Sequence, residues 1–240
     1  MSRVAIVAAL EREVRPLIRK WRVSEGRHEG RSFRFFENDQ DDVVLVCGGM
    51  GAEAARRAAE AVIAIYAPEM IYSAGFAGAL NSSLKVGEVV EPRRVVDASD
   101  GSSVSLAAGD RVLVSFASVA SPAQKAKLRD AFAAQAVDME AAAVARAAQA
   151  RGVGFAAVKA ISDDSAFSFP SLERFVDSDG KFREARFVLF AAFRPWLWPQ
   201  VARLATNSRR AARALCDRLQ KLSLNPASAS PEACEAVHRQ

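Results

Sequence analysis

Cysteine, histidine and long hydrophobic runs are all scarce in this 240-residue sequence. The three cysteines, Cys47, Cys216 and Cys234, are far apart and form no CxxC pair, which argues against a disulfide framework and against a zinc site. No segment approaches the roughly 20 apolar residues of a membrane-spanning helix, and the apolar stretch at the N-terminus is too short for a signal sequence. We therefore expect a cytoplasmic protein without a metal centre.

A surplus of positive charge is also missing from most of the chain. The formal net charge is +5, but residues 194–221 alone hold seven basic residues against one acid, Asp217, so the remainder is close to neutral. Nucleic-acid-binding domains carry a basic face or a known DNA- or RNA-binding motif on the folded body. Because the charge is confined to one C-terminal segment, we expect no nucleic-acid partner.

The sequence does contain the material for one large folded domain. Half of its residues are apolar and a quarter are charged, as in ordinary globular proteins. Apolar segments of strand length alternate with segments of helical periodicity, which predicts an α/β fold with a mixed, largely parallel central sheet and helices on both faces. The predicted strands cover residues 4–10, 32–37, 42–47, 69–80, 86–99, 111–120 and 154–165, and the predicted helices cover residues 10–21, 52–67, 121–133, 136–152 and 202–222.

The composition changes towards the C-terminus, and this change divides the chain into three parts. Residues 1–193 are predicted to form the α/β domain. Residues 194–222 combine tryptophans, arginines and helical periodicity, which predicts a basic amphipathic helical appendage. Residues 223–240 are rich in Pro, Ser and Ala, which predicts a flexible tail.

Three acids stand where an α/β fold usually binds its ligand, beyond the carboxyl ends of strands. Glu13 follows the first predicted strand, Glu140 lies in the motif VDMEA, and Asp163 ends the strand that closes with AISD. Two small-residue turns, CGGMG and AGFAG, allow a ligand to approach the backbone closely. Each acid also has an ordinary structural explanation, as a solvated helix residue, a first-turn acid or a helix cap.

Six motifs in a fixed order resemble one known family. They are AALEREV, CGGMG, AGFAGAL, KVGEVV, VDMEAAAVA and AISDDS, and together they cover roughly residues 3–165. They resemble the nucleoside phosphorylase and nucleosidase superfamily, particularly the methylthioadenosine/S-adenosylhomocysteine nucleosidases. The resemblance implies an oligomeric enzyme that needs no cofactor and cleaves the N-glycosidic bond of a purine nucleoside.

The resemblance also implies a role for each motif residue. Asp163, supported by Ser162, protonates N7 of the purine, because the base leaves readily only as a neutral molecule. Holding the acid protonated calls for burial or a nearby negative charge. Met139 packs on the ribose, and Glu140 binds its hydroxyls while the ring becomes cationic. Glu13 activates the attacking water.

Other site candidates depart from the common nucleosidases. Phe76 replaces a small hydroxyl residue, and SFASVAS lacks the phenylalanine that stacks on the purine. The candidates for contact with the substrate are Gly75, Phe76, Phe116, Val119 and Ala120, and those for the loop on the nucleophile side are Gly49 and Gly51.

These departures, together with the basic C-terminal segment, resemble the hopanoid-associated branch of the superfamily. That resemblance implies adenosylhopane, a nucleoside joined to a lipid, as substrate. Residues 187–221 combine aromatics and arginines that suit peripheral contact with the inner face of a membrane. The alternative is that this segment is a docking helix that completes the core.

The sequence does not decide whether water or phosphate is the nucleophile. Hydrolysis is favoured because the phosphate-binding GxPxR turn of the hexameric phosphorylases is absent. A phosphorylase with phosphate as co-substrate remains the alternative, since Arg12, Arg93 and Arg94 are candidates for contact with an anion. A third hypothesis is a non-catalytic protein that binds a nucleoside or a membrane surface.

Overall fold

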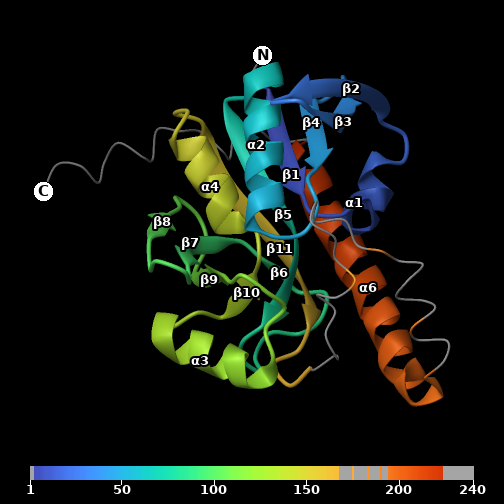
Figure 1. Cartoon of the computed structure of the whole chain (residues 1–240), viewed down its shortest axis with the longest axis vertical. Coiled ribbons are helices and arrows are strands. Elements are labelled where there is room, and N and C mark those ends of the chain that lie inside the picture. The colour runs from blue at the N-terminus through green and yellow to red at the C-terminus, as the bar shows by residue number, and fades with distance from the viewer. Residues whose placement is uncertain (1–2, 168–174, 176–182, 184–189, 191–193, 224–240) are drawn as a thin grey trace, which may run out of the picture.

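The computed structural model describes residues 3–167, 175, 183, 190 and 194–223, and its centre is a twisted mixed sheet (Figure 1). The described strands run in the order β2-β3-β4-β1-β5-β10-β9-β7-β8, with β11 paired to β5 and β6 paired to β11. The strands are β1 Val4–Ala8, β2 Arg22–His28, β3 Arg31–Asn38, β4 Val43–Cys47, β5 Met70–Ala79, β6 Val89–Val90, β7 Pro92–Asp97, β8 Ser103–Ser105, β9 Arg111–Ser115, β10 Ala136–Asp138 and β11 Gly154–Asp163. The helices are α1 Glu11–Ile18, α2 Ala52–Tyr66, α3 Pro122–Phe132, α4 Ala141–Gln149, the 3-10 turn Pro195–Leu197 and α6 Trp198–Ser223.

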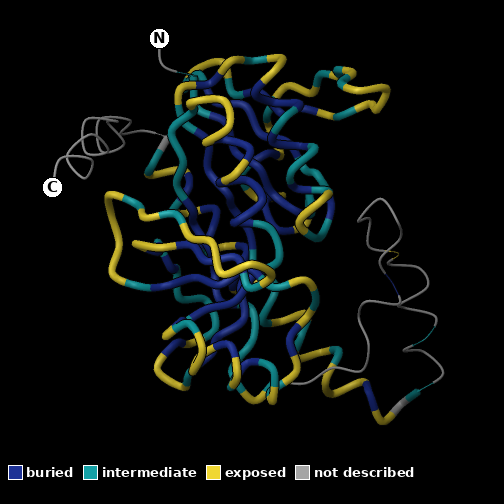
Figure 2. Tube along the Cα trace, turned by 60° about the vertical axis from the view of Figure 1, so that its left-hand side comes forward, coloured by how far each residue is buried: buried dark blue, intermediate teal, exposed yellow. Residues whose placement is uncertain are grey.

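The predicted fold class is confirmed by the pairing of the strands. Strand β1 lies between β4 and β5, and all three are parallel, as is the long pairing of β11 with β5. Strands β2, β3 and β4 pair antiparallel, as predicted for residues 32–47. Strand β10 also pairs with β5 in the antiparallel sense. Helices α2 and α4 cover one face of the sheet, and α1 and α6 cover the other (Figure 1). The central strands are buried between these layers, and much of the connecting backbone is exposed (Figure 2).

Helix α3 illustrates how the sequence fixes a helix start. Ser121 accepts a hydrogen bond from the backbone of Gln124, whose side chain bonds back to the Ser121 backbone, and Pro122 occupies the first helical position. This capping box satisfies two backbone N–H groups that the helix itself leaves unpaired. The helix therefore starts where the Ser-Pro pair predicts.

Several predicted elements differ from those observed: the strand predicted over residues 111–120 ends at Ser115, and residues 86–99 form two strands, β6 and β7. Residues 136–152 do not form one helix, because β10 ends at Asp138 and α4 starts only at Ala141. The carboxylate of Asp138 accepts the Ala141 N–H at 2.8 Å and the Ser115 hydroxyl at 2.6 Å, which fixes the break. Helix α1 ends at Ile18 rather than Trp21, and the polar segment after it forms β2, whose alternating exposure is that of an edge strand.

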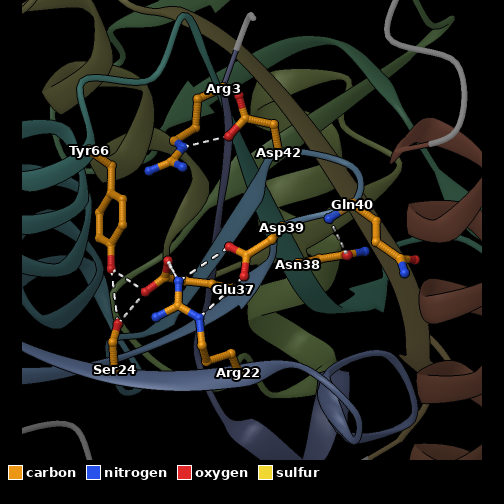
Figure 3. A network of polar contacts seen from close by, with 9 residues as sticks. All are labelled: Arg3, Arg22, Ser24, Glu37, Asn38, Asp39, Gln40, Asp42 and Tyr66. Atoms are coloured by element: carbon orange, nitrogen blue, oxygen red, sulfur yellow. Dashed lines mark hydrogen bonds and ion pairs between the residues drawn. The ribbon is translucent and has the colours of Figure 1, made fainter.

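A polar network ties the β2 and β3 edge to the end of α2 (Figure 3). Tyr66 donates its hydroxyl to Glu37 at 2.9 Å and lies 3.1 Å from the Ser24 hydroxyl, which also contacts Glu37. Arg22 contacts Glu37 at 2.7 Å and continues to Asp39. The largely buried Glu37 is thus fully partnered, which keeps the outer strands in register beside the core.

Helix α6 is part of the core over its C-terminal half. Ala211, Leu215 and Leu219 are at most 1% exposed and pack with Val14 and Ile18 of α1. These residues therefore match the alternative in which the C-terminal segment is a docking helix that completes the core. The predicted tail, apart from Ser223, lies outside the described residues, as does most of residues 168–193. Within the described part, no helix is both long and apolar enough to cross a bilayer.

Candidate active site

Glu13 lies in α1, just beyond the carboxyl end of β1, and its side chain points into the protein. It is 5% exposed, and its Oε2 is buried without a hydrogen-bond partner among the described residues. Burial, reinforced by the charge of Glu140, raises the pKa of Glu13 to about 8, although Arg12 and Lys159 oppose the shift. An unpartnered buried carboxyl is costly for stability, so this group is a candidate for chemistry rather than for folding.

Because Gly75 has no side chain, it leaves room for the carboxyl group of Glu13. A Cβ atom at position 75 would lie 3.0 Å from Glu13 Oε2 and 3.8 Å from Lys159 Nζ. Any side chain here would crowd the carboxyl group. The first glycine of AGFAG therefore matters for its lack of a side chain beside Glu13.

Glu140 is held by two backbone N–H groups, one from the distant Gly51 and one from its neighbour Met139. Its Oε1 accepts from Gly51 at 2.8 Å, and its Oε2 accepts from Met139 at 3.3 Å. Burial raises the pKa of Glu140, and the Lys159 charge opposes the shift. The turn CGGMG and the motif VDMEA thus meet, as their predicted shared site requires.

Lys159 was not among the predicted site residues. It lies in β11 and is 1% exposed, with Nζ 2.8 Å from Asp138 Oδ2 and 3.1 Å from the Ser73 hydroxyl. Burial alone would lower the pKa of Lys159, but the carboxylates of Asp138, Glu140 and Glu13 raise it above its ordinary value. Lys159 therefore supplies the positive charge that balances this cluster of buried acids.

Asp163 ends β11, and its carboxyl group contacts a cation. Its Oδ1 accepts the Ser162 hydroxyl at 2.8 Å, and its Oδ2 contacts the Lys125 ammonium, which also donates to the Asp164 carbonyl at 2.6 Å. The Lys125 side chain is 3% exposed and that of Asp163 is 20% exposed. The expected surroundings, burial or a negative neighbour, are therefore not what Asp163 has. The side chain of Asp164 points elsewhere and pairs with Arg203 of α6.

Because Gly78 has no side chain, it leaves room for the contact between Asp163 and Lys125. A Cβ atom there would lie 2.9 Å from Asp163 Oδ2 and 3.3 Å from Lys125 Nζ. The two glycines of AGFAG thus serve two different acids, Gly75 beside Glu13 and Gly78 beside Asp163. Strand β5 carries both glycines and so aligns the two halves of the site.

The remaining predicted residues lie at the edges of this arrangement or outside it. Phe116 and Ala120 pack beside α3, and Val119 between them is 37% exposed. Gly49 donates its N–H to the Ala9 carbonyl at 2.9 Å, which fixes the turn over the end of β1. Phe76 packs on the face of the sheet that α1 and α6 cover, with residues of both helices.

Comparison with known proteins identifies the relatives of the chain. Residues 3–121 and 111–193 match the model of the Phosphorylase superfamily. A curated 5'-methylthioadenosine/S-adenosylhomocysteine nucleosidase of Colwellia psychrerythraea strain 34H is 34% identical over 89 residues, and the match spans 37% of either chain.

Solved structures share the fold over a larger part of the chain. The Colwellia nucleosidase in complex with adenine has a TM-score of 0.58 and 25% identity, covering 68% of this chain and 83% of its own. Futalosine hydrolase of Helicobacter pylori strain 26695 has a TM-score of 0.65 and 19% identity, covering 92% and 98%. A Neisseria meningitidis nucleosidase with methylthio-immucillin-A has a TM-score of 0.66 and 21% identity, covering 92% and 100%. The last two likenesses concern the fold.

Proposed function

The chain belongs to the phosphorylase superfamily, and we propose that it hydrolyses the N-glycosidic bond of an adenine nucleoside and releases adenine. The observation that carries the proposal is the placement of Glu13, Glu140 and Asp163 at or just beyond the carboxyl ends of β1, β10 and β11. Relatives named as nucleosidases, one of them solved with adenine, support the choice of an adenine nucleoside. The reaction needs no cofactor.

In the proposed mechanism, Asp163 protonates N7 of the purine. The bond between the sugar and the protonated purine then breaks. Its electron pair moves to the purine, which leaves as a neutral base. Because the Lys125 ammonium favours the carboxylate, Asp163 takes up a proton from solvent in each turnover, and Lys125 stabilises the carboxylate that forms again when N7 receives this proton. Lys125 acts through Asp163 and is a positioning residue, while Ser162 fixes the rotation of the carboxyl group.

Glu140, with Met139 beside it, is proposed to bind the ribose. The N–H groups of Gly51 and Met139 orient its carboxylate and leave lone pairs for the two sugar hydroxyls. The sugar becomes cationic in the transition state, so a fixed negative charge stabilises that state more than the bound substrate. Glu140 would therefore contribute to rate as well as to binding.

Glu13 is proposed to accept the proton of the attacking water. Its Oε2 has a free lone pair in a buried setting, which suits a general base. The phosphorylase alternative has less support, because Arg93 and Arg94 are exposed on β7, which β5, β10 and β9 separate from β1. Arg12 is likewise exposed on α1. The positions of Arg93 and Arg94 favour water over phosphate as nucleophile.

The finer identity of the substrate is a separate proposal. We propose adenosylhopane, and with it a homo-oligomer that makes peripheral contact with a membrane through residues 187–221. The exposure of Trp196 and Trp198, at 69% and 57%, supports the membrane contact, because indole rings favour the interface of water and lipid. Most of residues 187–193 lie outside the described part of the chain.

Chromatography of adenine released from adenosylhopane and from methylthioadenosine, each with and without phosphate, tests the proposal. We expect release without phosphate and faster turnover of adenosylhopane. Faster turnover of methylthioadenosine would exclude the lipid-linked substrate but leave the reaction in place. Strict dependence on phosphate would identify a phosphorylase, and no release from either substrate would favour a binding protein.

A further inference from the structure

The surface pocket between α1 and α6 carries more positive charge than the proposed reaction uses. Its volume is about 620 Å³. Arg12, Arg15 and Arg19 of α1 line one side, Arg209 and Arg213 of α6 line the other, and Phe76 of β5 contributes to its wall. Residues from three distant parts of the sequence thus form one site, and of its arginines Arg12 also acts on the charge of Glu13.

Most of these arginines are not neutralised by the protein. Arg15, Arg19, Arg209 and Arg213 are exposed, and the described residues offer none of them an ion pair within 4.0 Å. Like charges gathered around one concavity repel each other and attract an anion. The pocket is therefore electrostatically incomplete without a negatively charged ligand.

The acids of the two helices do not cancel this charge. Glu11 of α1 contacts Arg34 of β3 at 3.0 Å, away from the pocket. Asp217 of α6 is exposed one turn after Arg213 and forms no ion pair among the described residues. Glu13, the other acid of α1, is buried, and its carboxyl group lies beside Gly75. The pocket therefore keeps a net positive charge.

The wall of the pocket is apolar beneath these charges. Phe76, Pro16 and Ala212 contribute carbon surface, and the long stems of the arginines add to it. A small hydrated anion would leave this surface in water. The lining instead fits a ligand with an anionic head and an apolar body.

The position of the pocket on α6 indicates where such a ligand comes from. Trp198 and Arg209 are eleven residues apart, which is about three helical turns, so both lie on one face of α6. Trp196 stands just before that helix, and both tryptophans are more than half exposed. The N-terminal half of α6 extends away from the sheet (Figure 1). Arginines and tryptophans therefore follow one side of a projecting helix.

We propose that the pocket between α1 and α6 binds the phosphate head of an anionic membrane lipid while Trp196 and Trp198 enter the headgroup layer. Guanidinium groups bind phosphate through paired hydrogen bonds, and indole rings favour the headgroup region. This inference rests on the proposed contact with a membrane and is independent of the proposed reaction. It places the head of the lipid between α1 and α6.

Sedimentation of the full chain with vesicles tests the lipid site. One set of vesicles is phosphatidylcholine alone, and the other also contains phosphatidylglycerol. Wild type is expected to bind the anionic set, and the double variant Arg209→Gln/Arg213→Gln is expected to bind it about 30-fold more weakly. The control Arg93→Gln/Arg94→Gln removes the same charge from exposed positions of β7 and should bind like wild type. Turnover of a water-soluble nucleoside is measured on every variant.

Each outcome decides the lipid proposal. Selective loss in the α6 variant with unchanged turnover would support it. Equal binding by both variants, or equal loss, would show that the pocket has no special role and would overturn it. If wild type ignores anionic vesicles but octyl phosphate or inorganic phosphate raises its melting temperature, a soluble anion is the ligand and the lipid is excluded. If wild type does not turn over the water-soluble nucleoside, this result counts against the proposed reaction and not against the lipid site.

Discussion

Replacing Asp163 by asparagine is expected to lower the rate of adenine release by about 10²–10⁴-fold while substrate still binds. The amide has nearly the size of the carboxyl group and can keep the Ser162 hydrogen bond, but it cannot give a proton to the purine. The loss should therefore fall on kcat. Steady-state kinetics combined with calorimetric binding of adenine would separate the two effects.

Two variants near Asp163 serve as controls for this result. Asp164→Asn should keep near-normal turnover, because that side chain pairs with Arg203 at the surface. Lys125→Met keeps the acid but removes the cation that stabilises its carboxylate, so we expect a smaller loss of kcat than in Asp163→Asn. Near-normal turnover in Asp163→Asn would remove this residue from the mechanism.

Replacing Glu13 by glutamine is expected to stop hydrolysis and to stabilise the fold. The pKa of Glu13 is raised to about 8, so below that pH the group is largely protonated in the folded protein. The base must be ionised to accept a proton, so kcat/KM of wild type should rise with pH up to about 8. The glutamine variant should lose this rise together with its activity.

The effect of Glu13 on stability has a definite sign. Because the folded pKa lies above the unfolded value, ionisation of this group costs no stability below the unfolded pKa and destabilises the fold increasingly as pH rises towards 8. Glutamine removes this penalty, so the free energy of unfolding at pH 7 should increase by up to about 3 kcal/mol. Glu11→Gln, on the outer side of the same helix, is the matched control. A destabilised and active Glu13→Gln variant would contradict the assignment.

The sequence predicts the fold class and the positions of the three acids for the same physical reason. Apolar strands in an α/β pattern specify a covered sheet, and the ends of those strands are the places where buried polar groups can face a ligand. Glu13 and Asp163 follow strands that are strongly apolar in sequence. Strand β10 was missed because it has only three residues and passes directly into a helix rich in alanine.

The two buried lysines show where local pattern fails. Lys125 and Lys127 occupy one polar helical segment, yet Lys125 is 2% exposed and Lys127 faces solvent. Only the packing of α3 against β9 and β10, which brings Lys125 to Asp163, distinguishes them. Lys159 did leave a signal, because a lysine within the apolar strand GFAAVKAIS must find acids to compensate its burial. A search for buried cations near the predicted acids would have found it.

The most direct test of the proposed hydrolysis is to run the reaction in water enriched in oxygen-18 and to analyse the sugar product by mass spectrometry, with phosphate present. If Glu13 activates water, the product is a free sugar that carries one heavy oxygen on its anomeric carbon, and adenine is released in equal amount. A ribosyl 1-phosphate without the heavy oxygen would contradict the proposed nucleophile, and the absence of any product would contradict the proposed reaction.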